Sequence, residues 1–262
     1  MKNFEELSDR LAKKDLDAVQ FFDALKKCEY LDAFQINSAE ELNSMGLDAM
    51  QVQSGNLSLC TRTRNWREQR FCVVDIETNN LLNNPKVIEI GAVTLQNGAV
   101  LGEFHSLIFT DFLPEAITNL TGITVEMLKN APSEAEVLEK FRLFLGTDVF
   151  AAHNADFDYT FLSDAFKRRY FAPLLNRKLC TLKLARKTIK SAKYGLGTLR
   201  GVLNITDGTL HRALSDAKSA AAVFQEACKN LPKFVVTTEN LIEFTKSNKN
   251  FLELKLPFMD EG

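Results

Sequence analysis

The first fifty residues carry apolar side chains at helical spacing. Phe4, Leu7 and Leu11 recur every three or four positions, and residues 38–41 read Ser-Ala-Glu-Glu, a capping box that predicts the start of another helix. Residues 51–66 change to alternating apolar and polar positions around a Ser-Gly-Asn turn, which predicts a hairpin. Helices followed by a hairpin indicate a small, mainly helical N-terminal module of winged-helix type.

From residue 71 onward the pattern is that of an α/β domain. Phe71–Ile76 is a short apolar run typical of a buried central strand. A Gln-Asn-Gly turn joins two further predicted strands. The other predicted elements are strands at 86–95, 99–109 and 149–152, helices at 114–129, 133–145, 157–169, 197–203 and 213–229, and a strand or helix at 179–185. We therefore expect an N-terminal module at 1–68, an α/β domain at 69–232 and a C-terminal tail at 233–262 with one helix at 238–246.

The composition is that of an ordinary globular protein and excludes several classes. The chain has 262 residues, of which 45% are hydrophobic and 25% charged. It contains no apolar run of the roughly 18–20 residues that span a bilayer, and its N-terminus has no apolar signal segment. The five cysteines are odd in number and irregularly spaced, which predicts free thiols and a cytoplasmic protein without a membrane partner.

Basic side chains gather in one stretch, although the net charge is only −2. Residues 165–206 contain no Asp or Glu and eleven basic residues: Lys167, Arg168, Arg169, Arg177, Lys178, Lys183, Arg186, Lys187, Lys190, Lys193 and Arg200. Such a strip is suited to contact a phosphate backbone. It is equally compatible with a solvated surface balanced by acids elsewhere in the fold, so the sequence leaves both interpretations open.

Three short blocks place carboxylates at the ends of α/β elements. Asp75 and Glu77 end an apolar strand, and alternate residues of a strand project from the same face. Asp158 lies in the first turn of the helix that follows another apolar strand. Asp216 lies near the start of the last long helix, five residues after His211. Each acid taken alone is explained as a helix cap or as half of an ion pair.

Taken together, the acids indicate a metal site. Two like charges on a buried strand are costly unless a cation neutralises them. No Cys or His accompanies them at zinc spacing, and oxygen ligands select Mg²⁺ or Mn²⁺. Two such ions at about 3.5–4 Å would clamp the attacking and leaving oxygens of a phosphodiester. His211 is then free to act as a general base on the attacking water.

At this point the sequence resembles a known family, the DEDDh 3′–5′ exonucleases. Within it, the epsilon proofreading subunits of bacterial DNA polymerase III are the most similar. The resemblance covers roughly residues 70–230 and implies an α/β, ribonuclease-H-like fold with a mixed five-stranded sheet flanked by helices. It rests on VVDIET at 73–78, HNADFD at 153–158 and HRALSD at 211–216, with weaker similarity at 87–92 (VIEIGA) and 121–124 (TGIT).

The resemblance also implies residue roles. Asp75, Glu77, Asp158 and Asp216 would bind two Mg²⁺ (or Mn²⁺) ions, and His211 would be the general base. Substrate contacts would come from Thr78, Asn79, Thr121, His153, Asn154 and Phe157. The implied reaction releases nucleoside 5′-monophosphates from the 3′ end of single-stranded or frayed DNA, in proofreading beside a polymerase catalytic subunit.

Two departures from the family pattern leave the substrate open. The first block commonly continues Thr-Thr-Gly, whereas here Thr78 is followed by Asn79 and Asn80, and Thr121 stands where His is common. Oligoribonucleases and tRNA-trimming ribonucleases use the same five residues, so RNA is the alternative substrate to DNA. A chain that acts mainly as a binding subunit, with its N-terminal module and tail docked on a polymerase, is the second alternative.

Overall fold

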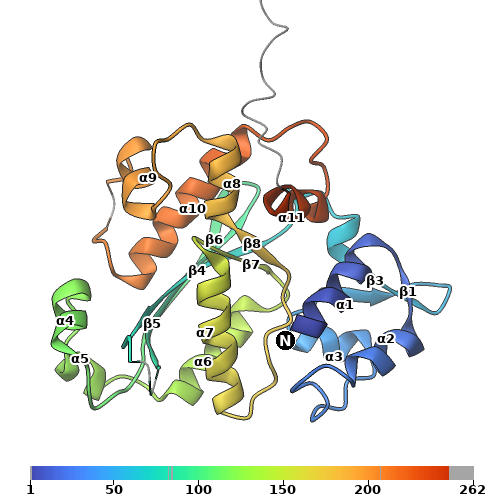
Figure 1. Cartoon of the computed structure of the whole chain (residues 1–262), viewed down its shortest axis with the longest axis horizontal. Helices are drawn as coiled ribbons and strands as arrows, with labels where there is room; N and C mark the ends of the chain where they lie inside the picture. The colour runs from blue at the N-terminus through green and yellow to red at the C-terminus, as the bar shows by residue number, and fades with distance from the viewer. Residues whose placement is uncertain (1, 82, 84, 207, 248–262) are drawn as a thin grey trace, which may run out of the picture.

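The computed structural model describes residues 2–81, 83, 85–206 and 208–247, and its N-terminal part has the order and pairing of a winged helix (Figure 1). One strand lies between the first two helices, and a hairpin follows the third. The three strands form an antiparallel sheet in the order β1-β3-β2. The elements are α1 (Lys2–Lys13), β1 (Leu16–Asp17), α2 (Ala18–Leu25), α3 (Ala39–Ser44), β2 (Ala49–Gln51) and β3 (Asn56–Leu59).

The predicted capping box forms at the start of α3. The Ser38 hydroxyl accepts a hydrogen bond from the Glu41 backbone N–H at 3.2 Å, and the Glu41 carboxylate accepts one from the Ser38 N–H at 3.0 Å. The alternating stretch after the turn is shorter as a strand than its pattern predicts. It ends at Leu59 and continues as a 3₁₀ helix, η1 (Cys60–Arg62).

The second part contains the mixed five-stranded sheet that the family resemblance implies. Its order is β6-β5-β4-β7-β8. Strands β4, β7 and β8 are parallel to one another, and β5 runs antiparallel to both of its neighbours, β4 and β6. At the β5–β6 turn Asn97 and Gly98 have φ of 49° and 76°, the left-handed conformation that this tight hairpin needs. The strands are β4 (Phe71–Thr78), β5 (Val87–Gln96), β6 (Ala99–Leu107), β7 (Val149–Ala152) and β8 (Lys178–Cys180).

Helices cover both faces of this sheet, and alternate side chains of β4 pack against the helices of opposite faces. Cys72, Val74 and Ile76 pack against α6 and α7, whereas Phe71 and Val73 pack against α8, α10 and α11. A strand buried on both faces is apolar at successive positions, as β4 is up to Val74. The helices of this part are α4 (Glu115–Thr121), α5 (Val125–Lys129), α6 (Glu134–Leu145), α7 (Ala155–Arg168), α8 (Thr181–Thr188), α9 (Leu196–Val202), α10 (Ala213–Lys229) and α11 (Thr238–Lys246).

The single helix predicted over 114–129 is two helices, α4 and α5. Gly122 takes φ 70° after the last turn of α4, a left-handed conformation that ends a helix and that Gly adopts without strain. Thr124 then caps α5 by accepting a hydrogen bond from the Met127 N–H at 3.3 Å. The Thr-Gly-Ile-Thr stretch therefore contains a stop signal followed by a start signal.

The segment predicted as a C-terminal tail belongs to the core up to Ser247. Its predicted helix is present as α11, and Leu241, Ile242 and Phe244 join the cluster of buried residues formed with α10. The Trp66 indole Nε1 donates to the Val235 carbonyl at 3.1 Å. Residues 248–262 lie outside the described residues.

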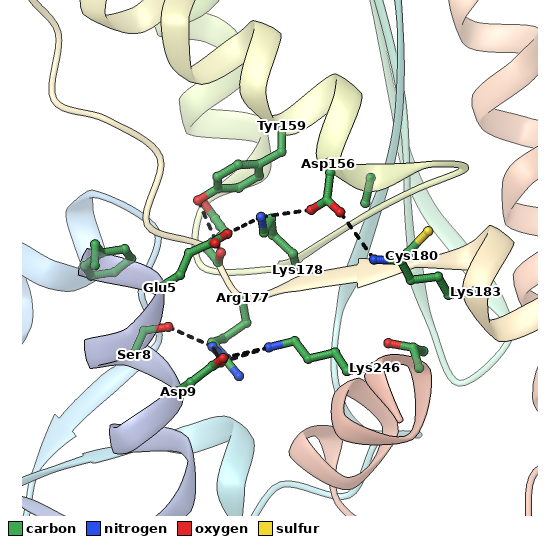
Figure 2. A pocket seen from close by; sticks show the side chains of 14 residues that line it. Glu5, Ser8, Asp9, Asp156, Tyr159, Arg177, Lys178, Cys180, Lys183 and Lys246 are labelled. Atoms are coloured by element: carbon green, nitrogen blue, oxygen red, sulfur yellow. Dashed lines mark hydrogen bonds and ion pairs between the residues drawn. The ribbon is translucent and has the colours of Figure 1, made fainter. Parts of the chain in front are cut away.

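A buried ion-pair network holds the winged-helix module against the α/β domain (Figure 2). The Arg177 guanidinium, just before β8, donates to Ser8 and Asp9 of α1 at 2.7 and 2.8 Å. It also donates to both carboxylate oxygens of Glu239 in α11, at 2.9 and 2.8 Å. Lys246 adds a further contact to Asp9 at 2.9 Å. Since Arg177 is only 7% exposed, these contacts tie three separate segments together.

Candidate active site

Asp75 and Glu77 project from the C-terminal half of β4, on the face that also carries Phe71 and Val73. Both are half-buried. In the antiparallel register with β5, Asp75 lies opposite Gly91 and Glu77 lies opposite Glu89. The two acids therefore point toward the face that α10 covers.

Asp158 is joined to the first pair by a backbone contact. It is 5% exposed in the first turn of α7, and its Oδ1 accepts a hydrogen bond from the Ile76 N–H, between Asp75 and Glu77, at 3.2 Å. The turn into α7 depends on Asn154, whose φ of 86° lies in the left-handed region that Asn tolerates better than most residues. The second sequence block thus folds directly onto the first.

Asp216 and His211 come together at the start of α10. The His211 backbone N–H donates to Asp216 Oδ2 at 2.9 Å, and this contact holds His211 at φ 61°, a strained conformation for a residue other than Gly. Strain of this kind is often found at functional sites. Among the described residues, Asp216 Oδ1 is buried without a hydrogen-bond partner, although Arg200 Nη1 approaches it at 3.9 Å. An orphaned buried carboxylate oxygen is one that a cation would satisfy.

The start of α10 is seated on β5 by Glu89, a residue to which the sequence analysis gave no role. Glu89 is fully buried and accepts hydrogen bonds from the Ala213 N–H at 2.9 Å and from Arg212 Nη2 at 2.8 Å. His105 Nε2 lies 2.7 Å from the same carboxylate. A Glu as the third residue of a run that is otherwise apolar from Val87 to Val93 was the signal that could have identified it.

Gly91 allows this seating. A Cβ on Gly91 would lie 2.1 Å from the backbone N of Leu214 and 2.2 Å from the backbone C of Ala213. No side chain fits between β5 and α10 at this level, which is opposite Asp75 in the sheet. The close approach brings Asp216 and His211 to the carboxylates of β4.

The assembled cluster is strongly anionic. Ligand atoms of Glu77, His211 and Asp216 lie within 4.8 Å of one another. Burial, with the charges of Asp158 and Asp216, raises the pKa of Asp75 well above its ordinary value. Burial and the Glu89 charge raise the pKa of Glu77 to about 7, and burial raises the pKa of Asp158 to about 7. Burial also raises the pKa of Asp216. Such a set of oxygen donors, repelling one another, fits a hard divalent cation.

Three of the six predicted substrate contacts are committed to the protein itself. Asn79 is buried, and its Oδ1 accepts from the Lys86 N–H at 2.9 Å. Thr121 is buried, and its hydroxyl donates to the Ile117 carbonyl at 2.9 Å. The His153 ring lies between Thr181 Oγ1 at 3.0 Å and the Tyr194 carbonyl at 2.8 Å. These side chains shape the loops around the acid cluster.

The other three predicted contacts are accessible. Thr78 is half-buried at the end of β4, and Asn154 is exposed at the start of α7. Phe157 is 45% exposed and packs against Phe161 with ring centroids 4.8 Å apart. An aromatic ring presented in this way offers a base a surface to stack on.

Most cations of the basic strip, residues 165–206, contact other groups of the protein. Lys167 pairs with Asp164, Arg168 and Arg169 with Glu134, Arg177 with Asp9 and Glu239, Lys178 with Glu5 and Asp156, Lys183 with Asp156, and Arg200 with Asp216. Lys187 donates to the Phe244 carbonyl at 2.6 Å. The ion pairs of the first seven residues favour the balanced-surface interpretation for them, and Lys187 is occupied by a backbone carbonyl. Three cations of the strip have no such partner among the described residues.

Comparison with known proteins identifies the class. Residues 72–224, more than half of the chain, match the exonuclease family RNase_T. The chain belongs to this family, and its three acidic blocks follow the DEDDh pattern of 3′–5′ exonucleases. In the part of the chain that the structure describes, no helix is long and apolar enough to cross a membrane.

Individual relatives extend the comparison. The chain is 33% identical to the PolC-type DNA polymerase III of Staphylococcus haemolyticus over 210 residues, which is 78% of this chain. It is 37% identical to that of Thermotoga petrophila over 192 residues, 72% of this chain. In both cases the match covers 14% of the relative, so the similarity is to one part of a much longer protein.

Solved structures of nucleases share the fold. Exonuclease X in complex with 5′-overhanging duplex DNA matches with a TM-score of 0.50 and 25% identity, over 67% of this chain and 99% of that chain. Exonuclease I of E. coli in complex with a dA16 oligonucleotide matches with a TM-score of 0.55 and 17% identity, over 64% of this chain and 42% of that one. The second likeness shows the fold alone.

Proposed function

We propose that this protein is a Mg²⁺-dependent 3′–5′ exonuclease that removes nucleoside 5′-monophosphates from single-stranded or frayed DNA ends and proofreads during DNA replication. The observation that carries the proposal is the convergence of four carboxylates and one histidine from β4, α7 and the start of α10. A positive charge between these acids would relieve their mutual repulsion.

Asp75, Glu77, Asp158 and Asp216 would hold two Mg²⁺ (or Mn²⁺) ions. Bound there, the ions would stabilise negative charge on the attacking and leaving oxygens of the phosphodiester. The Oδ1 of Asp216, which has no hydrogen-bond partner among the described residues, and the raised pKa of Asp75 support a cation at this place. The donor set is rich in oxygen, which favours hard cations over zinc.

His211 would be the general base. It is exposed, and a ring nitrogen lies within 4.8 Å of carboxylate oxygens of Glu77 and Asp216. The bond from its backbone N–H to Asp216 holds the ring on the acid cluster. A ring nitrogen in this place can accept a proton from the water that attacks the terminal phosphodiester.

DNA is the proposed substrate because the curated relatives are DNA polymerases. Proofreading follows from the energetics of a primer end, since a mismatched end frays at lower cost than a paired one and reaches a single-strand site more often. The similarity to part of PolC-type polymerases supports a polymerase catalytic subunit as partner and the cytoplasm as location.

The test uses 5′-labelled single-stranded DNA and RNA of matched sequence, with Mg²⁺ or with EDTA. We expect a one-nucleotide ladder on DNA that requires Mg²⁺. Asp158→Ala should abolish it. The matched control is Asp156→Ala, two residues earlier in the same block, because Asp156 is exposed and paired with Lys178 and Lys183 rather than with the acid cluster.

Each result decides one part of the proposal. Equal loss of activity in both variants would contradict the assignment of Asp158 as a ligand. A ladder on RNA alone would replace DNA by RNA as substrate. If the folded protein cleaves neither strand with Mg²⁺ or Mn²⁺, the catalytic proposal fails and a binding role in a polymerase complex takes its place. A His211→Ala rate within threefold of wild type would refute the general base, for which a loss of about 10²–10⁴ is expected.

A further inference from the structure

Three cations of the basic strip remain after the structure has paired the others. Arg186, Lys190 and Lys193 are exposed and have no ion pair or hydrogen bond from their side chains among the described residues. They lie within eight residues of chain, at the end of α8 and in the loop that leads to α9. An exposed cluster of one sign, without acids to balance it, is suited to a phosphate backbone.

The loop that carries these cations is attached to the second acidic block. His153 Nε2 donates to the carbonyl of Tyr194, the residue after Lys193, at 2.8 Å. His153 Nδ1 then faces the Thr181 hydroxyl, at 3.0 Å, at the start of α8. Burial lowers the pKa of His153, and the charge of Arg186 adds to this, so the ring is a neutral tether near Arg186.

The first turn of α9 lies beside the residue that precedes His211. A Cβ added at Gly197, in that turn, would lie 3.9 Å from Leu210 Cδ1, an ordinary van der Waals distance. Leu210 precedes His211 in the chain. Residues 189–197 therefore run between His153, five residues before Asp158, and the loop of His211. This places them beside the segments that carry the second and third acidic blocks.

We propose that Arg186, Lys190 and Lys193 form a basic rim that binds phosphates of the single strand upstream of the 3′ nucleotide being removed. The inference rests on the proposed function and adds the place where the upstream phosphates of the strand bind. The acid cluster would repel a strand whose terminal phosphodiester lies over it, so cations at the end of α8 and in the loop to α9 would offset that repulsion.

The winged-helix module offers no comparable surface on its third helix and hairpin. Residues 28–61, which include α3, β2 and β3, contain no Lys or Arg. Glu40 and Glu41 are exposed on α3. The helix that would face a phosphate backbone in a DNA-binding winged helix is therefore acidic here, and the rim is the better site for the strand.

The test compares a long and a minimal substrate. The full chain is assayed on dT16 and on the dinucleotide d(TpT), which has one phosphodiester and no upstream phosphates. In Arg186→Ala/Lys190→Ala/Lys193→Ala the ratio of kcat/KM on dT16 to that on d(TpT) should fall. Three phosphate contacts give a salt slope of about −2, so raising NaCl from 50 to 200 mM should cost the wild type about 20-fold more in this ratio than the variant.

The control removes the same charge elsewhere. Lys13→Ala/Lys14→Ala/Lys27→Ala takes three exposed lysines from the winged-helix module and should keep the wild-type ratio and slope. If the rim variant matches the wild type in both, the proposal is wrong. If the control variant loses the ratio instead, the strand crosses the winged-helix module and the rim is again excluded.

The rim and the proposed function fail separately. If the wild type cleaves neither substrate, the catalytic proposal is refuted, and fluorescence anisotropy with labelled dT16 decides the rim without catalysis. An equal Kd for the wild type and the rim variant at 50 mM NaCl would then reject it. A Kd at least tenfold weaker in the rim variant, with the control variant unchanged, would support it.

Discussion

Removing one charge from the acid cluster should stabilise the protein when no divalent cation is present. The change is Asp158→Asn. The amide Oδ1 can still accept the hydrogen bond that the Ile76 N–H makes at 3.2 Å, so the shape of the site is retained while the charge is lost. Burial raises the pKa of Asp158 from 3.8 to about 7, which means that the folded state holds the charged form unfavourably.

The size of the effect follows from that pKa. At 1.36 kcal/mol per pH unit, holding Asp158 ionised in the fold costs up to about 4 kcal/mol. For a chain of this size each kcal/mol changes Tm by about 2–4 °C, so the variant should unfold about 5–15 °C above the wild type at pH 8. Because the folded state holds more protons than the unfolded state between about pH 4 and pH 7, wild-type stability falls with rising pH across that window.

The assay is thermal unfolding in EDTA from pH 4 to pH 9. The two Tm curves should converge near pH 4, separate up to about pH 7 and run parallel above it. Asp156→Asn is the control, since its pairing with Lys178 and Lys183 lowers the pKa of Asp156 and predicts an equal or lower Tm. A Tm of Asp158→Asn at or below that of the wild type at pH 8 would refute the reasoning, and so would an offset that does not vary with pH.

Other predictions test the frame around the cluster. Gly91→Ala should lower stability by about 1–3 kcal/mol and reduce activity, because its Cβ would meet the backbone of α10 at 2.1 Å, whereas Gly102→Ala, with its nearest atom at 3.5 Å, should do neither in matched unfolding and nuclease assays. Glu89→Gln should lower kcat by about 10²-fold with little change in KM, since it seats α10; a pure KM effect would contradict this. Arg177→Ala should cost about 3–5 kcal/mol in urea unfolding by leaving Glu239 buried and unpaired, and adding Glu239→Gln should recover part of the loss.

The three acidic blocks of the candidate site could be predicted because their signals are local in the sequence. The apolar run before Asp75, the strand-to-helix turn before Asp158 and the start of α10 before Asp216 are each readable within about ten residues. The strand order β6-β5-β4-β7-β8 was not predicted, since the family resemblance implied only a mixed five-stranded sheet. The prediction of one helix over 114–129 missed the break at Gly122, although the signal is local: a Gly that ends one helix and a Thr that starts the next.

What the sequence did not reveal depends on contacts between distant segments. Glu89 and Ala213 are 124 residues apart, and no periodicity in the sequence predicts that the Ala213 N–H donates to the Glu89 carboxylate. Asn79 and Thr121 belong to blocks that resemble substrate-binding stretches, yet their side chains turn to nearby backbone groups. The conformation of the folded loop decides whether a polar side chain faces a ligand or the loop's own backbone. The residue type alone does not distinguish the two cases.

The pairing of the basic strip with acids decides which of its cations remain available to a ligand. A buried or half-buried charge must find a counter-charge, so a fold that brings a cation near an acid removes that cation from any role in recognition. Arg177 is consumed in this way by Asp9 and Glu239. Lys190 and Lys193 lie in the loop that His153 holds through the Tyr194 carbonyl, and no acid among the described residues pairs with them. The proposed basic rim would thus put positive charge beside the negative site, where a polyanion whose end must reach that site needs it.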